Sequence, residues 1–395
     1  MNKKIKNKIR YFLKDVVDNR GRNPENYFDS EKYPVIDNFL IENKIYPDLK
    51  KVKRYINQKT YDSFLRKYLE KDDVLITLVG NGFCSVSLSP SNEVVIIQNT
   101  IGLQTNEKLY NKFLYYYLIL QQKNLVKLNR SSSQPSLNQQ DLLDYEIEVP
   151  ENIQDQQKIA SILFTLDAKI ELNNRINDEL EQMVKTLYEY WFVQFDFPNK
   201  NSKPYKTSGG KMTWSKELKR EIPEGWEVKK ISDLLPVLTG KQDANFSTEN
   251  GKYNFFTCGE EILKCNSFEF EGKSVLVAGN GNFNIKLYEG KFNAYQRTYV
   301  LIPEDERYYT VVYLAVKDRI ASLTKGSRGS IVKFITKGDL ENIQIPLPRD
   351  KSLDIFSALS ITTKKIEKNI EENQKLAKLR DWLLPMLMNG QVSIK

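Results

Sequence analysis

The longest regular pattern of apolar and polar positions runs through two segments, 155–191 and 359–387. In each segment, apolar side chains recur at alternating steps of four and three residues, which is typical of a coiled-coil seam. Each seam also carries two asparagines near its middle. A buried asparagine costs stability unless it meets another polar group, so this pattern favours an antiparallel pair in which the asparagines meet. The alternative is that each helix packs on its own domain with its asparagines in solvent. The seam residues expected to pair are Leu163, Ile170, Asn173, Asn177, Leu180, Leu187, Leu359, Ile366, Asn369, Asn373, Leu376 and Leu383.

The second half of the chain repeats the first after about two hundred residues. Val74-Leu75-Ile76 matches Val275-Leu276-Val277, and a Gly-Asn-Gly turn follows each run, with the glycines 199 residues apart. The residues before the two long helices match at a spacing of 198, and those within the helices match at 196. Solenoid units repeat every 20 to 50 residues, so this period indicates duplication of a whole domain with its helix.

Each half also carries a mixed pattern of strands and a helix ahead of its long helix. We expect strands at 74–79, 93–97 and 146–149 in the first half and at 274–278, 297–302 and 343–347 in the second. Helices are expected at 109–122 and 309–322. The predicted fold is α/β (mixed α+β), with two similar domains joined by two long antiparallel coiled-coil helices in a pseudo-twofold internal repeat. The expected boundaries are 1–150 (first domain), 151–197 (first helix), 198–225 (linker), 226–348 (second domain) and 349–395 (second helix).

Composition and charge narrow the class of protein. The 395 residues are 40% hydrophobic, which is enough for real cores, and the net charge of +8 favours a polyanionic partner such as DNA, RNA or an acidic membrane surface. The opening residues lack the apolar core of a signal peptide, and no apolar run is long enough to span a membrane. Of the three cysteines, Cys84, Cys258 and Cys265, the last two could in principle ligate a metal, but no second pair completes four ligands, so we expect them to be buried, inert thiols. We therefore expect a reduced, cytoplasmic protein without a membrane partner.

The absence of histidine argues against most catalytic functions. Histidine is the usual general base and the commonest metal ligand, so His-dependent triads and Cys/His zinc sites are excluded. Glu271-Gly272-Lys273 has the Glu-x-Lys form of many nucleases, but so short a pattern arises freely in a chain that is 28% charged. No Asn-Pro-Pro-Tyr or Asp-Pro-Pro-Tyr run of an amino-methyltransferase is present. We expect no catalytic residue, bound cofactor or metal in this chain.

The chain has the order variable domain, long helix, variable domain, long helix. It also carries the run Pro223-Glu224-Gly225-Trp226 and the ending Leu384-Pro385-Met386-Leu387-Met388-Asn389-Gly390. In these features it resembles the specificity subunit of type I restriction-modification enzymes. The resemblance implies a non-catalytic subunit in which each domain recognises half of a split DNA target. It implies that the helices set the spacing and dock two methyltransferase subunits, with restriction subunits joining them. S-adenosylmethionine and ATP with Mg²⁺ would then belong to those partners. Two alternatives stay open: a protein-scaffolding module without DNA reading, and a fused methyltransferase or nuclease.

Candidate DNA contacts follow from residue type and position, because Arg suits guanine, Asn or Gln suits adenine, and Lys and Ser suit phosphate. The strongest candidates lie in two polar loops that occupy corresponding places before the last strand of each domain. Solvated turns are the alternative for these loops, and ordinary hairpin geometry is the alternative for the Gly-Asn-Gly turns. The candidates are Arg20, Arg22, Asn81, Arg130, Ser131, Ser132, Ser133, Gln134, Lys241, Gln242, Asn280, Lys325, Ser327, Arg328 and Ser330.

Aromatic and apolar clusters at the end of each long helix exceed what a two-helix seam requires. If exposed, they mark docking surfaces for partner subunits; the alternative is that they complete a local core. The candidates are Tyr188, Tyr190, Trp191, Phe192, Trp382, Leu384, Met386 and Leu387.

Overall fold

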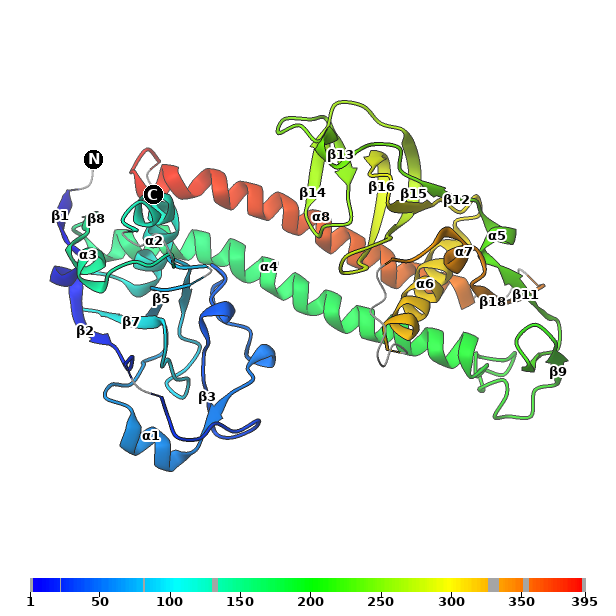
Figure 1. The fold of residues 1–395 in the computed structure, drawn as a ribbon, viewed down its shortest axis with the longest axis horizontal. Helices are drawn as coiled ribbons and strands as arrows, with labels where there is room; N and C mark the ends of the chain where they lie inside the picture. The colour runs from blue at the N-terminus through cyan, green and yellow to red at the C-terminus, as the bar shows by residue number, and fades with distance from the viewer. Residues whose placement is uncertain are drawn as a thin grey trace. The chain divides into compact units, whose positions relative to one another are not determined.

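The computed structural model describes residues 3–21, 23–80, 82–129, 134–325, 334–350 and 355–392, with the backbone alone at 323–325. The chain forms two compact units. Unit 1 comprises Met1–Asn173 with Glu372–Lys395, and unit 2 comprises Asn174–Glu371. Two long helices, α4 (Ile153–Tyr188) and α8 (Ile355–Met388), contribute to both units (Figure 1). Each unit combines sheets and helices, which confirms the predicted mixed fold class.

Unit 1 is built on a four-stranded antiparallel sheet, ordered β2 (Leu13–Val17), β7 (Thr100–Thr105), β5 (Val74–Thr77) and β6 (Val86–Leu88). Helix α2 (Asn111–Val126) packs on β5 and β6. A separate pair, β1 (Lys4–Lys8) with β8 (Glu146–Pro150), closes the domain next to the short helix α3 (Gln139–Asp144). A smaller subdomain holds β3 (Tyr33–Pro34), β4 (Tyr55–Ile56) and α1 (Gln58–Phe64).

Unit 2 repeats this plan with a larger sheet. Its six strands run in the order β12 (Val237–Thr239), β17 (Thr298–Leu301), β15 (Phe270–Ala278), β16 (Ile285–Ala294), β13 (Tyr253–Phe256) and β14 (Ile262–Cys265). The strands β11 (Trp226–Lys230) and β18 (Gln344–Pro348) form the separate closing pair. Helices α5 (Ile231–Leu234), α6 (Arg307–Lys325) and α7 (Lys337–Glu341) match the 3-10 turn Ile9–Phe12, α2 and α3 of unit 1 in chain order.

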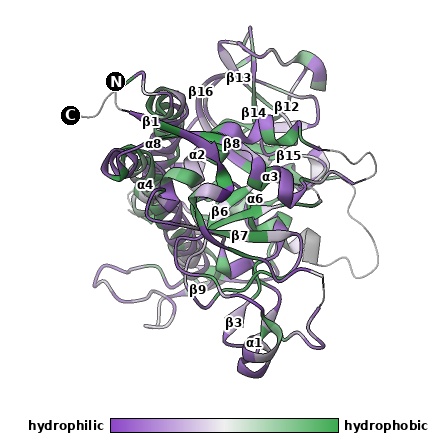
Figure 2. Ribbon diagram, turned by 90° about the vertical axis from the view of Figure 1, so that its left-hand side faces the viewer, coloured by the Kyte–Doolittle hydropathy of each residue, from purple (hydrophilic) through white to green (hydrophobic). Residues whose placement is uncertain are grey.

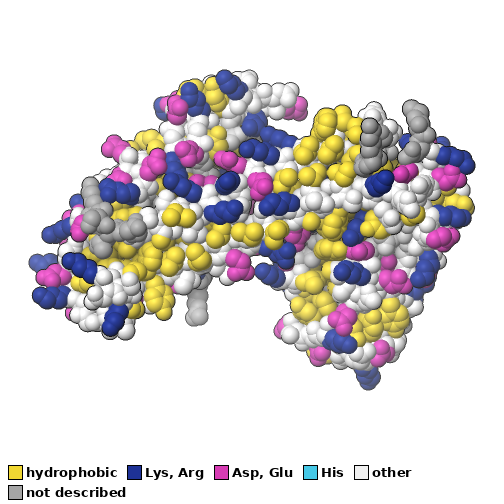
Figure 3. All heavy atoms as spheres, turned by 180° about the vertical axis from the view of Figure 1, so that it is seen from behind, with side chains coloured by type: hydrophobic (Ala, Val, Ile, Leu, Met, Phe, Trp, Pro, Cys, Tyr) yellow, Lys and Arg dark blue, Asp and Glu magenta, His cyan; other side chains and the backbone are white. Residues whose placement is uncertain are grey.

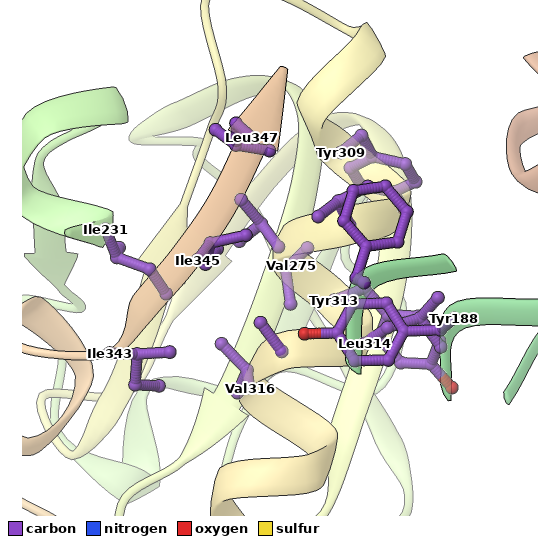
Figure 4. Close-up of a cluster of buried hydrophobic side chains, with 14 of the residues drawn as sticks. Tyr188, Ile231, Val275, Tyr309, Tyr313, Leu314, Val316, Ile343, Ile345 and Leu347 are labelled. Atoms are coloured by element: carbon purple, nitrogen blue, oxygen red, sulfur yellow. The ribbon is translucent and has the colours of Figure 1, made fainter. Parts of the chain in front are cut away.

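The core of unit 2 lies between its sheet, α6 and the parts of the long helices in this unit. Val275 of β15, Val316 of α6 and Ile345 of β18 are fully buried and point toward one another (Figure 4). Tyr188 at the end of α4 joins this cluster, so the helix is anchored to the domain by apolar packing. In Figure 2, the short strand β6 of unit 1 is green, whereas α4 and α8 carry both colours, as expected for a buried strand and for helices with one apolar face.

The strand registers identify equivalent positions in the two units. Ile76 pairs with Ile101 in unit 1, and Val277 pairs with Tyr299 in unit 2, which confirms the match of the two apolar runs. The Gly-Asn-Gly alignment, in contrast, is wrong by two residues. The amide of Leu78 donates to the Asn99 carbonyl (2.6 Å), and the amide of Gly279 donates to the Arg297 carbonyl (2.9 Å). Leu78 is therefore the structural equivalent of Gly279. The hairpin that follows this position is two residues longer in unit 1, which places Gly80 beyond it.

One expected strand needs correction. Residues 93–97 are not a strand: Val95 makes a single bridge to Val35, and the ladder is formed by β7 directly afterwards. The apolar run is buried core that crosses the domain without pairing along its length. The segment 198–225 contains a hairpin of β9 (Met212–Ser215) and β10 (Arg220–Pro223), and Phe197 stacks on Trp226 behind it.

The long helices pair antiparallel within each unit, as predicted. In unit 1, the Asn173 side-chain amide donates to Asn373 Oδ1 (2.9 Å), and Asn373 donates to the Ile170 carbonyl (3.4 Å). In unit 2, Asn369 donates to Asn177 Oδ1 (2.8 Å). Asn173 and Asn369 are each 1% exposed, so the alternative of solvent-facing asparagines is wrong for them. The remaining predicted seam residues are buried or half-buried.

Polar contacts attach each domain to its helices. In unit 1, the Tyr116 hydroxyl of α2 donates to Asp167 of α4 (2.8 Å), and Arg380 of α8 donates to the same carboxylate (2.6 Å). In unit 2, Tyr309 of α6 donates to Glu367 of α8 (2.9 Å). A buried contact between the Thr310 and Thr363 hydroxyls (2.8 Å) lies beside it. Each domain therefore has a fixed orientation on its own part of the helix pair.

Replacing Asn369 with leucine should destabilise the protein. The variant leaves the Asn177 amide buried beside an apolar group, which costs about 1–3 kcal/mol. The double variant Asn177→Leu/Asn369→Leu removes both amides and should recover most of the loss. Urea unfolding monitored by circular dichroism measures the change. The control is Lys368→Leu, an exposed neighbour on the same helix; an Asn369→Leu midpoint equal to that of the control would contradict the pairing.

Asp73 should make stability depend on pH. Its side chain is 2% exposed, and burial raises the pKa of this carboxyl to about 6. The folded state therefore keeps a proton between about pH 4 and 6 that the unfolded state releases, and the free energy of unfolding falls as pH rises through this range. Asp73→Asn removes this loss, so the variant should gain about 3 kcal/mol relative to the wild type between pH 4 and 7. Parallel pH profiles of unfolding midpoints would refute the assignment; Asp178→Asn on the exposed face of α4 is the control.

Candidate nucleic-acid interface

The loops of unit 2 gather at one end of its sheet. The Ile335 amide donates to the Gly279 carbonyl (2.7 Å), and Asn280 forms a bridge with Phe334. Gln242, in the loop after β12, forms a parallel bridge with Tyr295, in the turn after β16. These bonds bring together four loops that are far apart in the sequence. We name this surface loop end 2; it comprises residues 240–243, 279–284, 295–297 and 334–336.

Unit 1 has the same arrangement. The Leu137 amide donates to the Leu78 carbonyl (2.8 Å), and Val79 forms a bridge with Ser136. The loop after β2 reaches the same place, where Arg20 contacts Gln139. We name this surface loop end 1; it comprises residues 18–21, 23, 78–80, 82–85, 98–99 and 134–139. The two halves of the chain therefore present equivalent loops on equivalent scaffolds.

Five of the predicted DNA contacts have described side chains, and all five lie in these loop ends. They are Arg20 and Gln134 in loop end 1 and Lys241, Gln242 and Asn280 in loop end 2. The remaining candidates lie outside the described residues: Arg22, Asn81, Arg130, Ser131, Ser132, Ser133, Ser327, Arg328, Ser330 and the side chain of Lys325.

Two basic residues of the loop ends, Arg20 and Lys241, are held by acidic neighbours. Arg20 donates two hydrogen bonds to Asp18 (2.9 and 2.8 Å), and the guanidinium lowers the pKa of that carboxyl. Lys241 forms an ion pair with Glu269. The strand registers place Arg20 and Lys241 at equivalent positions, since Val16 pairs with Leu103 and Val237 with Leu301. Each domain therefore carries one oriented cation directly after its first sheet strand.

Several polar residues of the loop ends escaped the sequence analysis. Gln98 and Gln296 are exposed in the turns before β7 and β17, and Arg297 is exposed beside Gln296. Next to loop end 2, Lys286 at the start of β16 donates to the Gly259 carbonyl and to Asn284 Oδ1 (both 2.5 Å), and burial lowers the pKa of this amine. Of these residues, the two glutamines had a usable signal, because they lie 198 residues apart like the matched residues that follow them.

The helix-end clusters divide into buried and exposed residues. Tyr188 and Phe192 belong to the core of unit 2, and Leu384 and Leu387 belong to the core of unit 1. Tyr190 and Trp382 are 48% and 57% exposed. Trp191 and Met386 are half-buried. Of the eight predicted docking residues, Tyr190 and Trp382 are therefore the ones most exposed to solvent.

Three further observations concern the part of the chain that the structure describes. Within those residues, no cluster of three or more potential metal ligands occurs. None of the described helices is long and apolar enough to span a membrane. Cys265 is buried as expected, and Cys84 is buried too. Cys258 is half-buried, because it lies in the loop after β13, where its thiol donates to the Arg297 carbonyl (3.3 Å).

The duplicated domains, the paired helices and the loop ends agree with a known family. The family model described as "Type I restriction modification DNA specificity domain" matches residues 7–182 and again 223–377. The chain therefore belongs to the type I restriction-modification specificity subunits, the non-catalytic components that recognise the DNA target. The two separate matches also agree with the internal duplication.

Individual relatives give the same assignment. The chain is 37% identical to the Escherichia coli type I restriction enzyme EcoDI specificity subunit over 180 residues, an alignment that covers 44% of this chain and 40% of that protein. The Haemophilus influenzae HindI specificity subunit is 24% identical over 97% of this chain and 99% of its own length. Among solved structures, the type I restriction-modification system S subunit from M. genitalium has the same fold, with a TM-score of 0.60 at 18% identity over 98% of this chain and 96% of that one.

Replacing Lys241 with alanine should weaken duplex binding in a salt-dependent way. A lysine that contacts a phosphate releases about one counterion, so the slope of log affinity against log salt should fall by about one. Fluorescence anisotropy with a labelled duplex from 50 to 300 mM salt, a range of about sixfold, measures the slope. Lys185→Ala on α4 provides the exposed control. A slope unchanged from that control would exclude a phosphate contact at Lys241.

Proposed function

We propose that the two units each read one half of a bipartite double-stranded DNA target. The observation that carries this proposal is the presence of two equivalent loop ends with different side chains. Val79 in loop end 1 stands where Asn280 stands in loop end 2, and Asn99 stands where Arg297 stands. A common scaffold with different base-contacting groups suits two half-sites of different sequence.

The proposal assigns distinct tasks to the parts of the chain. Residues 1–150 and 226–348 are the recognition domains, 151–197 and 349–395 are the spacer helices, and 198–225 is the linker. Helix α4 has 36 residues and is about 54 Å long at 1.5 Å per residue. Its length, matched by α8, sets the gap between the half-sites. Such a role places the protein in the cytoplasm with the host DNA.

The spacer helices also present surface for protein partners. Apolar side chains are exposed on them in both units, and hydrophobic groups reach the surface beside lysines and arginines in Figure 3. We assign this surface, with Tyr190 and Trp382, to the docking of two methyltransferase subunits, which restriction subunits then join. S-adenosylmethionine and ATP with Mg²⁺ belong to those partners, and this chain supplies the sequence specificity. The large apolar residues exposed within the described parts of 151–197 and 349–395 are Leu172, Met183, Tyr190, Val193, Ile361, Ile370, Leu379, Trp382 and Val392.

The decisive experiment maps methylated adenine across host DNA by single-molecule sequencing. The chain is expressed with its cognate methyltransferase subunit, and a strain lacking the chain is the control. A split motif with a fixed gap, methylated only when the chain is present, is the expected result. Methylation that persists without the chain would refute the role and favour a scaffold that does not read DNA.

Lengthening both spacer helices by one heptad should change only the gap of the motif. Seven residues inserted after Asn173 in α4 and seven inserted before Glu372 in α8 preserve the seam and add about 10 Å of helix. The gap should grow by about three base pairs, taking ~34 Å per turn of ten pairs. The same sequencing measures the motif. A change in either half-site would contradict the separation of reading from spacing.

A further inference from the structure

Gln98 and Gln296 occupy the same position in the two loop ends. Thr100, the first residue of β7, pairs with Thr77, and Thr298, the first residue of β17, pairs with Ala278. The glutamines lie two residues before these threonines, and both are exposed. Their neighbours in the loop ends differ between the units. The glutamine is therefore a shared group on two otherwise different surfaces.

The two glutamines are also oriented in the same way. Gln98 donates from Nε2 to Oδ1 of Asn23, and Gln296 donates from Nε2 to Oδ1 of Asp243 (3.1 Å). Asn23 and Asp243 both lie in the loop after the first strand of the sheet, close behind the equivalent cations Arg20 and Lys241. A solvated turn residue needs no such partner, and its recurrence in both units indicates that the direction of the amide matters.

An amide held in this way has one donor and one acceptor left for a ligand. The contact with Asn23 or Asp243 uses one of the two N–H groups of Nε2, and the second N–H and Oε1 remain. This pair matches the major-groove edge of adenine, whose N7 accepts and whose N6 donates. The nearby cation suits a phosphate of the same nucleotide strand.

We infer that Gln98 and Gln296 are base-reading residues, each of which binds one adenine in the half-site of its own unit. This inference rests on the proposed function and extends it to particular contacts. Asn23 and Asp243 are positioning residues that act through the glutamines. The two half-sites, although different in sequence, then share an adenine at the equivalent place relative to each domain.

The test combines motif mapping with binding measurements on the complex assembled with the methyltransferase subunits. Gln98→Ala should relax one A·T position in one half-site and leave the other half-site intact, and Gln296→Ala should do the converse. Discrimination at the relaxed position should fall roughly ten- to hundredfold, since a bidentate contact contributes about 1–3 kcal/mol. Gln182→Ala, an exposed glutamine on α4, should leave the motif unchanged.

A modified base separates direct contact from an indirect effect. Duplexes carrying 7-deazaadenine at the relaxed position lack the N7 acceptor, so they should bind the wild-type complex more weakly and the alanine variant no differently. Asp243→Ala should reduce discrimination, whereas Asp243→Asn, which keeps an acceptor, should retain it. Where a variant no longer methylates DNA, its binding to duplexes with and without the A·T pair at that position is compared directly. Retained discrimination between these duplexes overturns the inference, and lost discrimination supports it.

The remaining outcomes are equally distinct. An unchanged motif in both glutamine variants, or a relaxed position that is G·C in the wild type, overturns the adenine assignment while leaving bipartite reading intact. A wild-type complex that produces no bipartite motif removes the proposed function itself.

Discussion

The need to pair buried amides constrains the whole chain. Asparagines placed on an apolar helix face are stable only where another polar group meets them, and the antiparallel alignment of α4 and α8 supplies that group in both units. Leucine at these positions would allow many registers, whereas the amide pairs accept one. Each domain is attached to its own part of the helices by polar contacts, such as Tyr116 to Asp167 and Tyr309 to Glu367. A single helix register therefore leaves the same helix surface facing each domain.

The scaffold and the reading surface are under different physical constraints. The four-strand order of unit 1, with α2 against it, recurs within the six-stranded sheet of unit 2, with α6 against it. Buried apolar side chains tolerate little change in volume, which limits how far these parts can differ. The loops at the sheet ends carry exposed polar groups, so they vary at little cost to folding. Within these loops, some of these polar groups are held by internal partners, among them Arg20 on Asp18, Lys241 on Glu269, and Gln296 on Asp243.

The sequence predicted the long helices, their antiparallel pairing and the duplicated domains, because periodicity and repetition are properties of the chain itself. The sequence analysis misplaced one strand: it expected 93–97, whereas the paired strand is β7. The run Val94–Ile97 is more apolar than β7, which contains a glycine. This glycine, Gly102, packs tightly against Val17 and Leu69. The sequence also aligned Gly80 with Gly279, whereas the backbone hydrogen bonds place Leu78 there. An insertion of two residues in a hairpin is invisible until strand register is known. The pairing of Gln296 with Asp243 was equally beyond prediction, because it depends on two loops separated by 53 residues.

The first and last strands of each domain lie side by side: Lys4 pairs with Pro150 in unit 1, and Trp226 pairs with Pro348 in unit 2. The chain therefore enters and leaves each domain at neighbouring points, close to the start of a long helix. In genetic terms, such a domain can be exchanged as one unit. An exchange between related genes with crossovers at these two strands would transfer a complete reading surface and leave the helices unchanged. The same geometry that stabilises the closed domain thus allows a new DNA specificity to arise without a new architecture.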